Sequence, residues 1–285
     1  MTNTIASARP QARSRWIPKR WYAHISLWIA CFFLGVPLFY TLLVSTQTRQ
    51  EINRYEFTPG SGLAENWDIV FNQRHLQDYM VNSAIMTAAI TIGKTILSLL
   101  AGLAFVYFRF PGKWLVFGFV LITLMMPTEV LIIALFRFIN KLNWDNTYLA
   151  LIVPFLASAT GSFLFRQHFS NIPAELSEAA QLDGANPLQF LFRVLVPMSW
   201  NTIGALAVVQ CLYAWNMYLW PNMIITDPNL DVVQVGIGTL RAGEGGGIQY
   251  GPLMLGAVVA SLPPLLVFIL LQKQFMSGFT LTRDK

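Results

Sequence analysis

The sequence has little charge, little cysteine and no phosphate-binding loop of the Gly-x-x-x-x-Gly-Lys-[Ser/Thr] type. Charged residues make up 12% of its 285 residues, whereas ordinary soluble domains carry roughly 25%. The two cysteines, Cys31 and Cys211, provide neither a disulfide framework nor a metal-ligand spacing. No Gly-x-x-x-x-Gly-Lys-[Ser/Thr] loop is present, and the three histidines are scattered along the chain. These absences exclude an ordinary soluble domain and leave no metal site to assign.

Long apolar runs are what the sequence has instead, since 55% of its residues are hydrophobic. A bilayer span needs about 20 predominantly apolar residues. Inside lipid the backbone must satisfy its own hydrogen bonds, which favours helices. The weak ten-residue alternation of a membrane barrel is not seen. We therefore predict an all-α, polytopic membrane protein with six transmembrane helices, at about 25–46, 82–108, 114–138, 147–169, 198–220 and 252–275.

The distribution of charge predicts how these spans are oriented. The side that holds both termini carries 12 of the 19 cations, and the other side carries 6 cations and nine of the 14 acids. The positive-inside rule then places both termini in the cytoplasm. Residues 1–24 are expected to form a basic cytoplasmic segment that contacts anionic lipid rather than nucleic acid. Residues 25–285 are expected to form one transmembrane domain.

A polar segment at 170–197 interrupts the apolar runs and falls on the predicted cytoplasmic side. Pro173 suits the first turn of a helix, and Asp183–Gly184 can end that helix with a left-handed glycine. Pro187 can begin a second helix to Val196, and Pro197 marks the return to the membrane. We predict a short helix, a sharp bend and a second helix across the cytoplasmic face. A plain amphipathic connection is the alternative on geometry alone.

The same segment contains a recognisable spacing of residues. It reads Glu178-Ala-Ala, three residues, Gly184, nine residues, then Val194-x-Val196-Pro197. This pattern resembles the cytoplasmic coupling loop of the membrane subunits of ABC importers. From the second predicted span onward the chain also resembles the carbohydrate-uptake branch of that family, and its glycerol-3-phosphate subgroup in particular. The segments that carry this likeness are Thr91–Lys94, Phe108–Pro111, Thr123–Val130, Ala157–Thr160, Phe163–Gln167, Trp215–Pro221 and Ile224–Asp227.

The resemblance implies a type I ABC importer permease fold and a transport subunit that is not an enzyme. It implies three kinds of partner besides the lipid bilayer: a homologous second permease subunit, two copies of an ABC ATPase that bind ATP and Mg, and an external solute-binding protein. It implies no nucleic acid. The chain itself would hold no cofactor. The implied location is a bacterial cytoplasmic membrane. The residues implied to engage the ATPase are Glu178, Ala179, Ala180, Asp183, Gly184, Pro187 and Pro197.

Two groups of residues are candidates for the translocation path. Lys94 and Glu129 are charges inside predicted spans, and such residues are functional candidates by default. They can form an ion pair between adjacent spans, or Lys94 can attract an anionic solute. Asn216, Tyr218 and Trp220 end the fifth span, where they can contact a polyol or form an aromatic belt at the interface.

Glycine and proline mark further points of interest. The external run Gly243, Glu244, Gly245, Gly246 and Gly247 is either a flexible loop tip or a contact loop for the binding protein. Pro127 and Pro154 lie within spans, where they are expected to kink the helix and to free backbone carbonyls toward neighbours or water. Pro263–Pro264 is expected to break the last span in the same way. Asn82–Ser83 is expected to cap the second span.

The expected function is half of an import path for glycerol-3-phosphate or a glycerophosphodiester. A permease for a neutral sugar or oligosaccharide is the nearest alternative. A secondary transporter or channel has no need for the 170–197 segment, and inverted repeats are not evident. An intramembrane enzyme would need a Ser/Lys pair, a His-Glu-x-x-His motif or a Gly-Asp motif, and none is apparent in the sequence.

Overall fold

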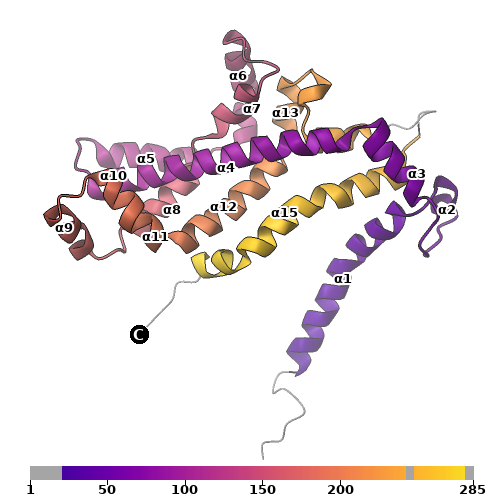
Figure 1. The fold of residues 1–285 in the computed structure, drawn as a ribbon, viewed down its shortest axis with the longest axis horizontal. Helices are drawn as coiled ribbons and strands as arrows, with labels where there is room; N and C mark the ends of the chain where they lie inside the picture. Colours follow the sequence, from indigo (N-terminus) through magenta and orange to yellow (C-terminus); the bar gives the residue numbers. More distant parts are fainter. Residues whose placement is uncertain (1–20, 242–246, 280–285) are drawn as a thin grey trace, which may run out of the picture.

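A computed structural model describes residues 21–241 and 247–279 of the chain, and helices dominate this part (Figure 1). The all-α prediction is confirmed. The predicted basic segment at 1–24 lies mostly outside the described residues. The helices are α1 (Trp21–Ser45), α2 (Arg49–Asn53), α3 (Leu63–Trp67), η1 (Asp68–Gln73), α4 (Leu76–Tyr107), α5 (Lys113–Leu124), α6 (Thr128–Lys141), α7 (Tyr148–Ile152), η2 (Val153–Phe155), α8 (Ala159–Phe169), α9 (Ala174–Leu182), α10 (Pro187–Phe190), η3 (Leu191–Leu195), α11 (Val196–Met198), α12 (Trp200–Trp215), α13 (Leu219–Ile224), η4 (Pro228–Leu230), α14 (Val233–Thr239) and α15 (Tyr250–Phe279).

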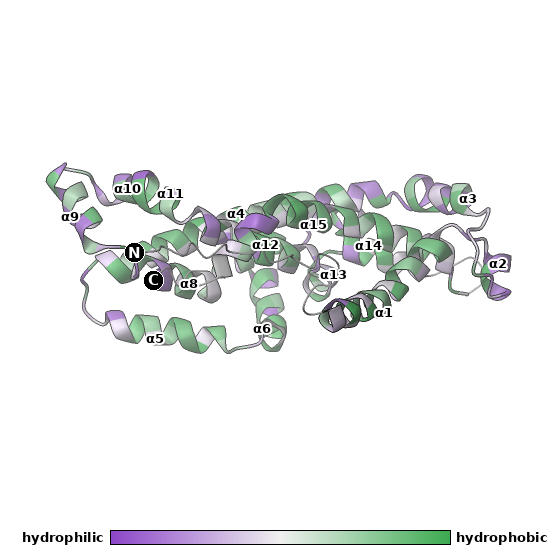
Figure 2. Cartoon of the chain, turned by 90° about the horizontal axis from the view of Figure 1, so that it is seen from below, coloured by the Kyte–Doolittle hydropathy of each residue, from purple (hydrophilic) through white to green (hydrophobic). Residues whose placement is uncertain are grey.

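The long helices form an extended array. α12 packs between α4 and α15, and α8 packs against α4. α1 contacts α15 and then diverges from the rest, so most of its surface is open (Figure 1). The short helices α2 and α3 lie at one end of the long axis, and α9 to α11 lie at the other (Figure 1). Polar residues gather at these two ends, and apolar residues cover the helices between them (Figure 2).

The helices can be compared with the six predicted spans. By length and composition α1, α4 and α15 are each able to cross a membrane. Two further crossings are possible if bent pairs each form one span: α7–η2 with α8, bent by 41°, and α10–α11 with α12, bent by 82°. The predicted span at 114–138 is not one helix in the structure. α5 ends at Leu124 and α6 begins after Pro127, whose extended backbone (φ −63°, ψ 130°) interrupts the run.

The prediction that Asn82–Ser83 caps the second span is wrong. α4 begins six residues earlier, at Leu76, after a left-handed residue at His75. Asn82 and Ser83 are buried within α4 and hold the segment from Asn229 to Val233 instead. The Asn82 amide donates to the backbone oxygens of Asn229 (2.8 Å) and Asp231 (2.9 Å), and the Ser83 hydroxyl accepts from the Val233 N–H (2.7 Å). Their polar atoms therefore serve a distant segment rather than the helix end.

Two prolines leave a backbone carbonyl oxygen without its helical donor, and a tryptophan indole donates a hydrogen bond to each of these oxygens. In a helix the N–H of residue 264 would donate to the Ala260 oxygen, but proline has none. The indole N–H of Trp215 donates to that oxygen at 3.0 Å. Likewise Pro154 cannot serve the Ala150 oxygen, and the indole N–H of Trp220 donates to it at 3.0 Å. The predicted release of a carbonyl toward a neighbour is confirmed at Pro154. The predicted break at Pro263–Pro264 is wrong, because α15 runs without interruption from Tyr250 to Phe279, and the indole of Trp215 satisfies the carbonyl that Pro264 leaves free.

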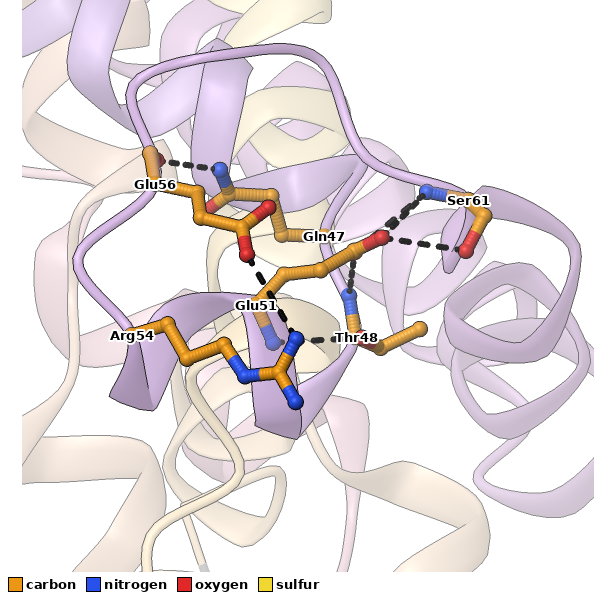
Figure 3. A network of polar contacts seen from close by, with 6 residues as sticks. All are labelled: Gln47, Thr48, Glu51, Arg54, Glu56 and Ser61. Atoms are coloured by element: carbon orange, nitrogen blue, oxygen red, sulfur yellow. Dashed lines mark hydrogen bonds and ion pairs between the residues drawn. The ribbon is translucent and has the colours of Figure 1, made fainter.

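A polar network closes the turn at the α2 end of the molecule (Figure 3). The Glu51 carboxylate accepts hydrogen bonds from the Thr48 N–H (2.7 Å) and from the backbone N–H and hydroxyl of Ser61 (3.2 and 3.1 Å). The Gln47 amide donates to the Glu56 oxygen at 2.6 Å. One anionic side chain therefore joins the start of α2 to the segment that leads into α3.

Candidate functional site

The segment predicted to couple to an ATPase forms two helices with a sharp bend between them. α9 begins directly after Pro173, and its C-cap is Asp183. Gly184 follows with φ +70°, the left-handed conformation that glycine adopts without strain. Asn186 then caps α10, because its side-chain oxygen accepts from the Gln189 N–H at 2.8 Å. The predicted helix–bend–helix geometry is confirmed, although the turn into α12 comes at Ser199 and not at Pro197.

The first half of this segment projects from the molecule. No residue of α9 is buried. Among the residues expected to engage a partner, Ala180 is half-buried, and the others are exposed: Glu178, Ala179, Asp183, Gly184, Pro187 and Pro197. Sequence reasoning missed Leu182, whose side chain is 89% exposed. The signal was available, because Leu182 lies three residues after Ala179 and hence on the same face of α9.

The second half of the segment is firmly anchored. Phe190, Leu191 and Leu195 are buried in one apolar cluster with residues of α4, α8 and α12. The Phe190 ring meets the Tyr107 ring edge to face, with centroids 5.1 Å apart. The Tyr107 hydroxyl donates to the Phe169 oxygen at 3.4 Å. Because α10 and η3 are packed into the core formed by α4, α8 and α12, a displacement of α9 that moves α10 must also move these three helices.

The path candidates come together only in part. The Lys94 ammonium lies 4.5 Å from the centre of the Tyr213 ring, a cation–π contact between α4 and α12. Tyr213 also lines a cavity of about 360 Å³ with Asn216, Tyr218 and Trp220. Sequence reasoning missed Tyr213, although it lies three residues before Asn216 and hence on the same helix face.

The remaining path candidates have different surroundings. Trp220 is 2% exposed, and its ring packs against Phe155 in the core, so little of it is open to a solute. Asn216 donates to the Leu212 oxygen and accepts from the Gln234 amide at 3.2 Å. The side chain of Glu129 lies outside the described residues, so its pairing with Lys94 stays a prediction.

The glycine-rich candidate loop is described only at its end. Gly243, Glu244, Gly245 and Gly246 lie outside the described residues. A Cβ at Gly247 would lie 2.6 Å from the Arg49 guanidinium, so this glycine permits a close approach to α2. Next to it, residues of α2, α3 and the start of α15 line a cavity of about 480 Å³.

No metal centre is found in residues 21–241 and 247–279, where no group of three or more His, Cys, Asp or Glu side chains is placed to hold an ion. The described residues instead offer an exposed helix joined to a packed bundle, and a cation of α4 over an aromatic ring of α12 that also lines a cavity.

Known proteins resemble the chain along most of its length. The permease protein UgpE of the sn-glycerol-3-phosphate transport system of Pectobacterium atrosepticum is 37% identical over 265 residues, which cover 90% of this chain and 94% of that protein. The protein of the same name in Brucella suis is 35% identical over 268 residues, covering 91% and 95%.

Solved structures share the fold. A bacterial ABC transporter involved in the import of the acidic polysaccharide alginate matches with a TM-score of 0.79 and 17% identity, over 94% of this chain and 100% of that one. A family model for the binding-protein-dependent transport system inner membrane component matches residues 94–279. These matches confirm the expected ABC permease fold, and the chain belongs to the family of inner membrane components of binding-protein-dependent transport systems.

Proposed function

We propose that this chain forms half of the path by which an ABC importer carries glycerol-3-phosphate, or a glycerophosphodiester, across the bacterial cytoplasmic membrane. The chain is a multi-pass transport subunit and not an enzyme. The observation that carries the choice of solute is the likeness, over nine-tenths of the chain, to permeases of sn-glycerol-3-phosphate transport systems. The proposed solute is tested by comparing how fast the importer takes up glycerol-3-phosphate, glycerol and maltodextrin.

The proposed assembly contains a homologous second permease subunit, two copies of an ABC ATPase and an external binding protein. The ATPases hold ATP and Mg, and both termini of this chain lie on their side of the membrane. The open surface of α1, where only Val44 and Ser45 are buried, leaves room for a second subunit as well as for lipid. The polar ends in Figure 2 fit partners on the two sides of the membrane.

Coupling is proposed to pass through α9. The small side chains of exposed Ala179 and half-buried Ala180 allow close approach of another protein, and Leu182 offers an apolar contact for a partner pocket. Glu178 adds a charge in the middle of α9, and Asp183 adds one at its C-terminal end. Because α10 and η3 are packed against α4, α8 and α12, displacement of α9 by an ATPase reaches the helices that line the path.

The solute path is proposed to run beside Lys94. Its ammonium lies over the Tyr213 ring, and no carboxylate of the described residues is paired with it. A cation at this depth attracts a phosphate more strongly than in water, because the surroundings screen charge less. Tyr213, Asn216 and Tyr218 would then contact the glycerol moiety.

The experiment is uptake and ATP hydrolysis by the reconstituted importer. Gly184→Ala is expected to lower uptake per ATP hydrolysed, whereas Gly112→Ala is the matched control. Gly112 has φ +72°, and a Cβ at either glycine meets nothing within 4 Å, so both changes carry the same backbone strain. Equal effects of the two changes would refute coupling through this bend.

Lys94→Ala tests the solute. It is expected to leave the complex assembled and to reduce uptake of glycerol-3-phosphate at least several-fold. Normal uptake by an assembled Lys94→Ala importer would refute the role of this cation. Uptake of maltodextrin with no uptake of glycerol-3-phosphate by the unaltered importer would overturn the proposed solute and favour the neutral-sugar alternative.

A further inference from the structure

A pair of cations near the turn from α4 to α5 has no part in the proposed transport cycle. The Arg166 guanidinium lies 5.3 Å from the centre of the Trp114 ring and 4.7 Å from that of Phe117. The Lys113 ammonium donates to the Phe108 oxygen at 3.0 Å, which holds it at the end of α4. Two helices and a turn thus fix the positions of both charges.

These cations line an open cavity. It measures about 220 Å³ and lies between α4, α5 and α8. A second cavity of about 300 Å³ adjoins it, shares Lys113 and Trp114, and adds Arg109. No carboxylate lines either cavity, and within the described part of the chain neither Lys113 nor Arg166 is paired with one. The two cavities therefore hold an excess of positive charge, which favours an anionic ligand.

An apolar surface continues from the cavities along α5. Trp114 is 70% exposed, and Leu115, Phe119 and Ile122 are also exposed further along this helix. α5 is apolar beyond its first residues (Figure 2). A tryptophan between a cationic group and an exposed apolar helix is typical of the headgroup level of a bilayer. A soluble anion would use the charges but would leave the apolar surface without a partner.

We propose that this surface binds an anionic phospholipid in the leaflet on the side of the coupling segment. Lys113 and Arg166 contact the phosphate of the headgroup, Trp114 lies at its level, and the acyl chains run along α5. Arginine suits this position because its planar guanidinium can stack on rings and still donate to a phosphate. In Figure 2, α5 lies on one side of α8, whereas α10 and α11 lie on its other side. A protein bound to α9 would therefore leave the site open to lipid.

The test measures tryptophan quenching in the assembled importer, reconstituted into phosphatidylcholine discs. Part of the lipid is replaced by brominated phosphatidylglycerol or by brominated phosphatidylcholine. Subtracting the signal of Trp114→Phe separates this position from the other eight tryptophans of the chain and from any in the partner subunits. We expect the anionic lipid to quench Trp114 more strongly than the neutral one. Arg166→Gln should weaken the apparent affinity for brominated phosphatidylglycerol about fivefold, the usual effect of one cation near an anionic surface.

Two controls separate charge from folding. Arg166→Lys keeps the charge and should retain most of the preference for the anionic lipid. Arg193→Gln removes a cation of η3 that lines neither cavity, and it should leave the preference unchanged. Equal quenching by both lipids, or an undiminished preference in Arg166→Gln, would overturn the proposal. Loss of the preference on adding inorganic phosphate, but not sodium chloride of equal ionic strength, would assign the site to a soluble anion instead.

Discussion

The hydrogen bond from Trp215 to Ala260 makes a quantitative prediction about stability. Trp215 is 4% exposed, and its indole N–H is the donor that replaces the missing N–H of Pro264. Trp215→Phe removes that donor and leaves a buried carbonyl without a partner. Hydrogen bonds between helices in membranes contribute about 0.6 kcal/mol on average and up to about 1.7. We expect a value near 1 kcal/mol, because the carbonyl has no helical donor.

A double-mutant cycle isolates this bond from the loss of ring volume. In Pro264→Ala the new N–H can donate to the Ala260 oxygen, so Trp215→Phe should then lose only its packing contribution. The difference between the two costs of Trp215→Phe is the coupling energy, expected at about 1 kcal/mol. It is measured from unfolding of the purified chain by sodium dodecyl sulfate in mixed micelles.

The matched pair at the other proline checks that the effect is general. Trp220→Phe with Pro154→Ala involves the same donor, the same kind of carbonyl and the same 3.0 Å distance. Trp28→Phe on α1 is the control, since that ring is 76% exposed. If Trp215→Phe lowers the free energy of unfolding by the same amount with proline and with alanine at position 264, the hydrogen bond contributes nothing to stability and the reasoning fails.

Three further predictions concern individual side chains. The hydrogen bond from the Thr48 N–H lowers the pKa of Glu51, so the stability that this carboxylate contributes is present above pH 4.5, its unfolded pKa, and is lost as pH falls through the lower folded pKa. Glu51→Gln should therefore reduce the loss of thermal stability at acid pH in a series of unfolding measurements. Burial raises the pKa of Asp231, and the nearby charge of Asp227 raises it further, so the stability of the protein falls as pH rises from 3.8 through the folded pKa of Asp231. Asp231→Asn should therefore stabilise the protein at pH 7 and have no such effect at low pH. Phe190→Ala should cost about 3–5 kcal/mol in the same unfolding assay, as for other buried phenylalanines, and a cost under 1 kcal/mol would contradict the anchoring of α10.

Features set by a few neighbouring residues could be predicted from the sequence. Pro173, Gly184 and Pro187 act through their own backbones, and the bend they form is the one expected. The apolar runs likewise identified α1, α4 and α15, because length and hydropathy are properties of a single segment. The break at Pro127 was recognised as a kink, but its size depends on how α6 packs and not on the proline alone.

Features that depend on distant partners could not be predicted. In the sequence Asn82 looks like a helix cap, because its acceptors, the backbone oxygens of Asn229 and Asp231, are brought beside it only by folding. The carbonyls freed by proline were expected, but nothing local identifies Trp215 and Trp220 as their donors. Trp220 itself ends an apolar run, which suggests an interface, and its burial becomes clear only from the packing of α13 against α7 and Phe155.

The bend between α11 and α12 has a mechanical consequence. The arm from Pro187 to Met198 meets α12 at 82°, and at 1.5 Å per residue it is about 18 Å long, against about 24 Å for α12. A load on α9 along the direction of α12 therefore acts as a torque about Ser199 and tilts that helix instead of sliding it. With arms of such similar length, a shift of a few ångströms at α9 would give a comparable sideways displacement at Trp215, the far end of α12.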